Sequence, residues 1–133
     1  MTAPALATWH RIVQSGDWEA LEDLLAEDAV FHSPVVHRPQ VGRPLVMGYL
    51  LAASRVLLNS SFRYVREVAS GNEAVLEFEV EIEGIHINGV DLIRWNDAQR
   101  IVDFKVMVRP LKAINLLHAR MMAELEAGNS GKD

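Results

Sequence analysis

The spacing of the apolar residues changes at residues 59–61, and this change limits the fold more than any other feature of the sequence. Before it, apolar residues recur about every 3.6 positions, as on one face of a helix; after it, they alternate with polar residues, as in a half-buried strand. The first part predicts helices over 6–15, 17–25 and 44–59, with a short strand over 29–34 that ends at a proline. Helices followed by a run of strands favour an α+β domain over an alternating α/β fold.

The second part of the chain predicts an antiparallel meander. Its four strands are expected over residues 62–68, 76–83, 84–95 and 100–109. Asn88-Gly89 lies in the middle of the third strand, where a glycine commonly marks a bulge that bends the strand and changes the face of the following side chains. We therefore expect a bent sheet that can wrap around a cavity.

A last helix is expected to begin at Pro110. Two of its apolar residues, Leu116 and Met122, lie off the face shared by Leu111, Ile114, Leu117, Met121 and Leu125. A helix with apolar residues outside one stripe can cover a second surface, which indicates a partner subunit. We expect one domain over residues 1–127 and a flexible C-terminal tail over residues 128–133.

Composition excludes several classes of function. The 133 residues carry a net charge of -5, which argues against a nucleic-acid partner, and they include no cysteine, which excludes disulfides and thiol nucleophiles. The N-terminal residues do not have the pattern of a secretory signal, and the longest apolar stretch is far short of the ~20 residues that span a bilayer. We expect a cytoplasmic protein with no membrane partner.

Several short motifs resemble the nuclear transport factor 2-like superfamily, which includes SnoaL-like and ketosteroid isomerase-like domains. They are SGDWEAL at 15–21, LLAEDAVF at 24–31, GRP at 42–44, DLIRW at 91–95 and RIV at 100–102. The resemblance implies a cystatin-like α+β roll, in which a cone-shaped, curved antiparallel sheet packs against N-terminal helices and encloses an apolar pocket. It also implies a homodimer.

The resemblance carries over only part of the known catalytic patterns. Asp91 matches the acid that stabilises the oxyanion in ketosteroid isomerase, whereas Ser33 stands at the position of its general base and Trp9 at that of its tyrosine. In SnoaL-like cyclases, the acid/base aspartate falls on the position of Val106. An activity of this chain is therefore not simply inherited from either group.

Asp91 is the first candidate for a catalytic residue. It lies in an otherwise apolar strand, where burial would raise the pKa of its carboxyl and make it a hydrogen-bond donor or a general acid at neutral pH. The alternative is a structural role at a strand edge, paired with Arg94 or Arg109.

His32 and His86 are the candidates for a general base. Both lie in predicted strands, and a one-residue bulge at Asn88-Gly89 would place His86 on the same face as Asp91. The alternative is two structural histidines, one of them facing outward. No metal site is expected, because the five histidines do not form a compact ligand motif.

Four aromatic residues are candidates for ligand binding: Trp9, Phe31, Tyr49 and Phe62. At helical or strand spacing such residues also serve simply as core. Tyr49 is the stronger candidate, because a buried hydroxyl needs a partner.

Two functions follow from these residues. The first is an enzyme that acts on a small, largely apolar carbonyl compound by an isomerase, cyclase or dehydratase step, needs no cofactor, and uses a histidine as base and Asp91 as acid. The second is a non-catalytic ligand-binding or protein-interaction domain, which the residues at positions 33 and 106 favour. No feature of the sequence supports a cargo surface of a nuclear-transport adaptor.

Overall fold

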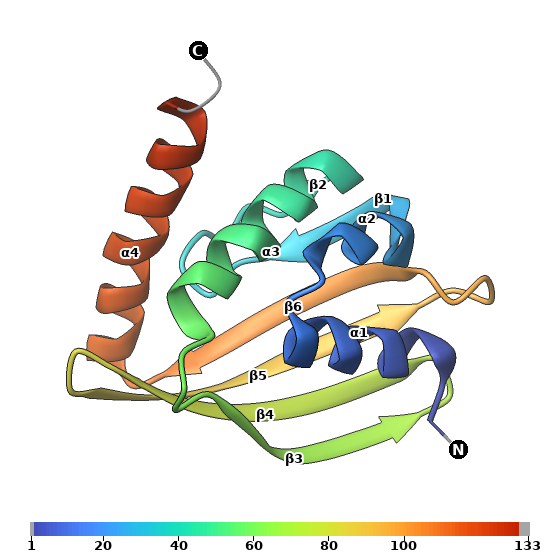
Figure 1. Ribbon diagram of the computed structural model, residues 1–133, viewed down its shortest axis with the longest axis horizontal. Coiled ribbons are helices and arrows are strands. Elements are labelled where there is room, and N and C mark those ends of the chain that lie inside the picture. Colours follow the sequence, from blue (N-terminus) through green and yellow to red (C-terminus); the bar gives the residue numbers. More distant parts are fainter. Residues whose placement is uncertain (1, 131–133) are drawn as a thin grey trace.

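The computed structural model describes residues 2–130 and shows a curved six-stranded sheet with helices on one face and at one end (Figure 1). The helices are α1 Pro4–Ser15, α2 Leu21–Leu24, α3 Arg43–Leu57 and α4 Leu111–Ser130, with a 3-10 turn at Trp18–Ala20. The strands are β1 Leu25–His32, β2 Gln40–Val41, β3 Arg63–Ser70, β4 Glu73–Ile82, β5 Ile85–Trp95 and β6 Ile101–Arg109. The expected α+β class, with N-terminal helices and a C-terminal helix, is confirmed.

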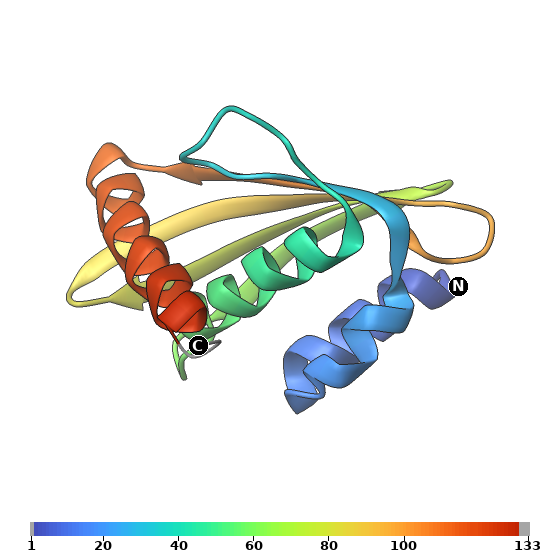
Figure 2. The ribbon, with the colours of Figure 1, turned by 90° about the horizontal axis from the view of Figure 1, so that it is seen from above.

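The sheet has the strand order β2-β1-β6-β5-β4-β3. Strands β3 to β6 form the predicted antiparallel meander. Strand β1 pairs with β6 in parallel, and this register places Phe31 beside Phe104. Figures 1 and 2 show α1 and α3 across one face of the sheet, with α4 beside α3 at the end where β4 turns into β5. The main core therefore lies between this face and the helices.

The second helix and the first strand differ from their predicted bounds. The helix expected over 17–25 is a 3-10 turn followed by one helical turn, and β1 already begins at Leu25. Leu25 and Ala26 are buried, and Leu25 pairs with Ile101 of β6. The apolar spacing at Leu25 is compatible with a helix, but pairing with β6 holds the backbone there in an extended conformation.

The bulge predicted at Asn88-Gly89 is wrong. The pairing of β5 with β4 is regular from Glu73 to Ile82, and its pairing with β6 is regular from Asn88 to Arg94. Gly89 serves a different purpose, because it faces Phe78 across the ladder and a β-carbon there would lie 2.4 Å from Cζ of that ring. The glycine makes room for an aromatic ring on the neighbouring strand.

Helix α4 packs at the end of the sheet largely with the predicted face, of which Leu117 is buried and Ile114, Met121 and Leu125 are half-buried, and Leu111 is the exception. Ala113 and Leu117 are buried, and Leu116 packs against a second core cluster around Phe78 and Ile87, whereas Leu111 is 72% exposed. The helix runs to Ser130, past the domain end expected at residue 127, and residues 131–133 lie outside the described part of the chain.

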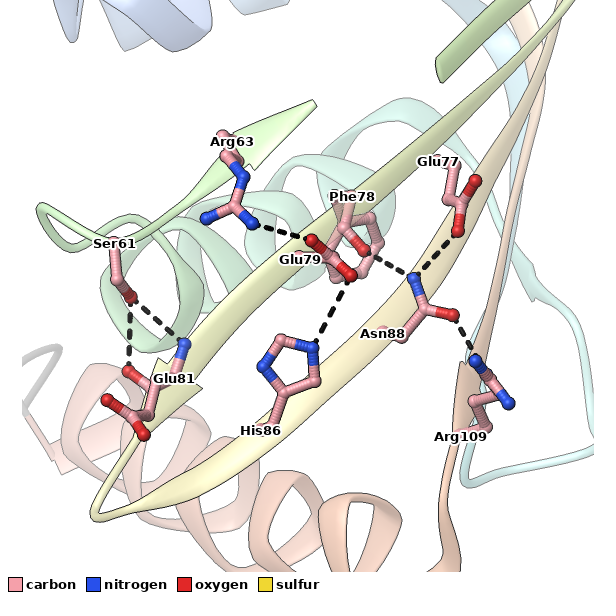
Figure 3. Close-up of polar contacts among 9 residues, drawn as sticks. All are labelled: Ser61, Arg63, Glu77, Phe78, Glu79, Glu81, His86, Asn88 and Arg109. Carbon is pink, nitrogen blue, oxygen red and sulfur yellow. Dashed lines mark hydrogen bonds and ion pairs between the residues drawn. The ribbon is translucent and has the colours of Figure 1, made fainter. Parts of the chain in front are cut away.

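The face of the sheet away from the helices carries its charges in pairs (Figure 3). Two glutamates of β4 pair with arginines of β3. Arg63 lies 2.8 Å from Glu79 (Figure 3), and Arg66 lies 2.9 Å from Glu77. Asn88 joins the network by donating to Glu77 and accepting from Arg109 Nε. Ion pairs and hydrogen bonds thus link strands β3, β4, β5 and β6 on this outer face.

Among the described residues, no helix is both long and apolar enough to cross a bilayer. The predicted homodimer and the predicted cytoplasmic location remain predictions.

The role of Gly89 can be tested with two Gly→Ala substitutions. Gly89→Ala should lower the free energy of unfolding by about 1–3 kcal/mol, because the new methyl group overlaps the buried Phe78 ring and the Met107 carbonyl oxygen. Gly48→Ala in α3 is the matched control, since nothing lies within 4 Å of its β-carbon position, and it should raise stability by roughly 0.5–1 kcal/mol. Denaturant unfolding checks both; a Gly89→Ala protein as stable as the wild type would contradict this role.

Candidate functional site

An apolar cavity lies between the sheet and helices α1 and α3. Its volume is about 50 Å³, and most of its walls are aromatic or aliphatic side chains. The aromatic residues that line it are Trp9, Trp18, Phe31, Phe62, Tyr64, Phe78 and Phe104. We call this space the inner cavity.

Asp91 is the carboxylate in the wall of the inner cavity. Odd-numbered residues from Ile87 to Trp95 point inward from β5, so the regular pleat carries Asp91 to the same side as its apolar neighbours. Its partners across the ladder are Leu76 on β4 and Val106 on β6. The only polar or charged residue among the buried side chains described here is thus an acid surrounded by hydrocarbon.

Burial changes the acid–base properties of Asp91. Loss of water around the carboxyl raises the pKa of Asp91 to about 7, and the hydrogen bond from Tyr64 opposes this rise. At neutral pH the neutral and ionised forms are therefore both populated. The proposed alternative of an ion pair with Arg94 or Arg109 does not occur, since Asp91 points to the interior and both arginines lie on the outer side of the sheet.

A chain of hydrogen bonds runs from α1 to Asp91. Trp9 Nε1 donates to the Tyr64 hydroxyl over 3.1 Å, and this hydroxyl donates to Asp91 Oδ2 over 2.7 Å. Burial, and then the neighbouring Asp91, raise the pKa of Tyr64 well above its usual value, so its hydroxyl stays neutral. Among the described residues only Tyr64 hydrogen-bonds the Asp91 carboxyl, which leaves Oδ1 for a bound molecule.

Three of the four predicted aromatic residues line the inner cavity: Trp9, Phe31 and Phe62. Tyr49 does not. It stacks on Phe31, with ring centroids 5.5 Å apart, and faces a separate groove between α3 and α4. Phe31 contributes to both spaces.

The structure does not bring the two candidate histidines to the inner cavity. His32 alternates with the inward-facing Phe31, and its Nε2 donates a 2.9 Å hydrogen bond to Asp103 Oδ1 of β6. His86 lies on the outer face, where its 61% exposed side chain is 3.5 Å from Glu79 (Figure 3). Because β5 has no bulge at Asn88-Gly89, the expectation that His86 shares a face with Asp91 is wrong.

Two of the three positions that differ from known catalytic patterns, Ser33 and Val106, have structural roles here. The Ser33 hydroxyl accepts from the backbone N–H groups of Val35 and Val36 and so shapes the turn after β1. Val106 faces the inner cavity beside Asp91 and adds an apolar wall instead of a second acid.

Sequence reasoning missed Tyr64 as a site residue. Its signal was present, because Tyr64 follows the apolar Phe62 in the alternating pattern of β3, and a buried hydroxyl needs a partner. What the pattern could not supply was the partner, which is 27 positions away in the sequence.

Within residues 2–130, no group of three or more acidic or histidine side chains is arranged to hold a metal ion. In the inner cavity the described residues offer two groups for chemistry: the Asp91 carboxyl, with a pKa of about 7, and the neutral phenol of Tyr64.

Comparison with known proteins agrees with this architecture. Among solved structures, a steroid delta-isomerase from Pseudomonas aeruginosa is 38% identical, covers 95% of this chain and 92% of its own, and superposes with a TM-score of 0.88. An uncharacterized bacterial protein with a cystatin-like fold from Silicibacter pomeroyi is 35% identical over 90% of this chain and 84% of its own, with a TM-score of 0.82. An NTF2-like protein of unknown function from Mesorhizobium loti, 22% identical over 80% of this chain and 88% of its own, shares the fold with a TM-score of 0.68.

No curated protein sequence matches the chain. The model of the SnoaL-like domain family matches residues 6–104, which is most of the chain and includes the cavity-lining part of β5. The chain therefore belongs to the SnoaL-like domain family and has its NTF2-like fold.

Proposed function

We propose that this protein binds a small, largely apolar carbonyl compound in the inner cavity, and that Asp91 holds the carbonyl oxygen and transfers a proton to or from the bound molecule. The observation that carries this proposal is the buried Asp91 carboxyl, with one oxygen held by Tyr64 and a pKa of about 7. An apolar pocket with one fixed polar group is the usual form of a site for a small apolar ligand.

The two protonation states of Asp91 support two parts of this role. The neutral carboxyl can donate a hydrogen bond to a carbonyl oxygen, which stabilises the negative charge that develops there when a neighbouring carbon loses a proton. The neutral carboxyl forms in the reaction itself: the ionised carboxylate takes the proton from the carbon beside the carbonyl group, then donates a hydrogen bond to the resulting oxyanion and returns the proton to a carbon further along. A pKa near the working pH is the most effective for such transfer. Tyr64 keeps the carboxyl in one orientation for both.

An isomerisation fits this chemistry best. A proton leaves the carbon beside the carbonyl group and returns to a carbon further along the chain, so that a double bond moves and no atom is lost. The name of the 38% identical relative, steroid delta-isomerase, supports the isomerase class for this chain. Cyclase and dehydratase steps use the same proton transfers and belong to the same proposal.

A specific observation favours a second candidate function, which is ligand binding without catalysis. Among the described residues that line the inner cavity, only Asp91 and Tyr64 have titratable side chains. Because the candidate histidines lie elsewhere, Asp91 would have to act as both acid and base. The two candidates differ in whether a product forms.

Substitutions of Asp91 test the proposal. In Asp91→Asn the amide can still donate to a carbonyl oxygen but cannot take a proton, so cyclohexanone should bind while turnover of unconjugated unsaturated ketones falls at least about 10²-fold. In Asp91→Leu the hydrogen bond is lost as well, and binding should weaken about tenfold. Binding is followed by the NMR signal of the Trp9 indole, with Trp95, which does not line the cavity, as internal reference. Product is followed by the absorbance of the conjugated ketone.

Three outcomes separate the candidates. If Asp91→Asn turns over the substrate as fast as the wild type, Asp91 does not transfer the proton. Ketone binding by the wild type with no product from any substrate, steroid or non-steroid, would favour the non-catalytic function. Binding unchanged in Asp91→Leu would contradict both.

The pH dependence of ketone binding reports the protonation state of Asp91. Since only the neutral carboxyl donates to a carbonyl oxygen, wild-type affinity should fall as pH rises through about 7. Tyr64→Phe removes the hydrogen bond that lowers the pKa of Asp91, so the midpoint should move to higher pH. Tyr49→Phe is the matched control outside the cavity and should leave the midpoint in place. A midpoint that does not move in Tyr64→Phe would show that another group titrates.

The free energy of unfolding should also depend on pH through Asp91, and the direction of this dependence follows from its raised pKa. The pKa of Asp91 is higher in the folded protein, about 7, than the 3.8 of a free side chain, so the folded state binds the extra proton. Stability from this group is therefore full below about pH 4 and is lost as pH rises to about 7. Relative to Asp91→Asn, the wild type should lose roughly 4 kcal/mol of unfolding free energy between pH 4 and pH 8. Denaturant unfolding at several pH values measures this, and a constant difference would disprove the raised pKa.

A further inference from the structure

A second apolar space adjoins the inner cavity. It lies between α3, α4 and the turn after β1, has a volume of about 80 Å³, and is lined almost entirely by hydrocarbon. Its side on α4 consists of Leu117, His118, Met121, Met122 and Leu125. We call it the α3/α4 groove; Figure 2 shows the two helices side by side.

The inner cavity and the α3/α4 groove share one wall. The side chains that line both spaces are Phe31, Ala53, Leu57 and Val106. Val106 is also the residue of β6 that pairs with Asp91. A molecule bound at the Asp91 carboxyl is therefore one strand away from the groove.

The position of α4 leaves the groove open. Ala113 and Leu117 anchor the first half of the helix in the core, and Arg120 Nε donates to Glu83 over 2.9 Å at the turn between β4 and β5. Further along the helix, the apolar side chain of Met122 is not buried in the core, and 48% of it is exposed. Methionine side chains adapt readily to flexible apolar ligands.

A second opening beside the inner cavity has a different character. It shares Val13, Leu58, Phe62 and Tyr64 with the cavity, but it is also lined by the polar side chains of His10, Gln14, Asn59 and Arg63. An apolar chain would gain little by lying across these groups, because their hydration would be lost without replacement. The apolar part of a ligand is better matched to the α3/α4 groove.

We propose that the ligand of this protein is a carbonyl compound with an unbranched apolar chain, which passes between Leu57 and Val106 and lies in the α3/α4 groove. This inference rests on the proposed function, since it assumes that the carbonyl group is held at Asp91. The inner cavity alone is far smaller than the roughly 300 Å³ of a usual ligand pocket, so a larger ligand must extend beyond it. Both spaces are small, about 50 and 80 Å³, which suits a slender chain.

A series of 2-alkanones, from 2-butanone to 2-dodecanone, tests the proposal. Once the chain is long enough to reach the groove, each methylene should raise affinity about fourfold, equivalent to about 0.8 kcal/mol per buried methylene. The methyl signals of Met121 and Met122 should shift with 2-decanone but not with 2-butanone. Met47, which lies on α3 away from the groove, is the reference signal.

Two glutamate substitutions on α4 provide the matched comparison. Met122→Glu places a charge in the groove and should abolish the gain with chain length while leaving 2-butanone affinity unchanged. Leu111→Glu changes a residue of the same helix that is 72% exposed and does not line the groove, so the gain should persist.

The outcomes distinguish this inference from the function on which it rests. If 2-butanone binding depends on Asp91 but affinity does not rise with length, or rises equally in Met122→Glu, the groove proposal is wrong and the proposed function stands. If no ketone of any length binds, both are wrong. If the Met122 signal changes with protein concentration and not with ketone, the groove holds a second copy of the chain and the proposal is overturned.

Discussion

The regular pleat of β5 between β4 and β6 is the constraint on which the rest of this site depends. Side chains alternate between the two faces of a regularly paired strand, so Asp91 lies on the same inner face as Ile87 and Ile93. An acid placed there loses its hydration, and this loss would make its charged form costly. The pKa of the Asp91 carboxyl is raised as a result, and one hydrogen bond, from Tyr64, is made to it.

The same pleat sorts the other polar residues to the opposite side. Asn88 and His86 alternate with the buried residues of β5 and join the glutamates and arginines of the outer face. The two sides of the sheet consequently have different chemistry: many paired charges in contact with water on one side, and one carboxyl in hydrocarbon on the other. The Asp91 carboxyl on the inner side changes its protonation near neutral pH.

Membership of the SnoaL-like family sets the architecture but not the catalytic residues. The inner cavity retains one acid, Asp91, while Ser33 shapes a turn and Val106 forms part of a wall. Proton transfer by one carboxyl, supported by a tyrosine that stays neutral, is the chemistry compatible with this arrangement. The apolar wall at Val106 has a second effect, since it lies between the carboxyl and the α3/α4 groove.

The sequence by itself determined the class of the fold and most of the strands, and it made Asp91 the first candidate, because apolar periodicity is a local property of the chain. It also indicated Trp9, Phe31 and Phe62 as cavity residues. The tertiary structure alone decided the partner of Asp91, the faces of His32 and His86, and the position of Tyr49. These depend on strand register and on contacts between distant residues: Gly89 could mark a bulge or make room for Phe78, and only the pairing of β4 with β5 distinguishes the two.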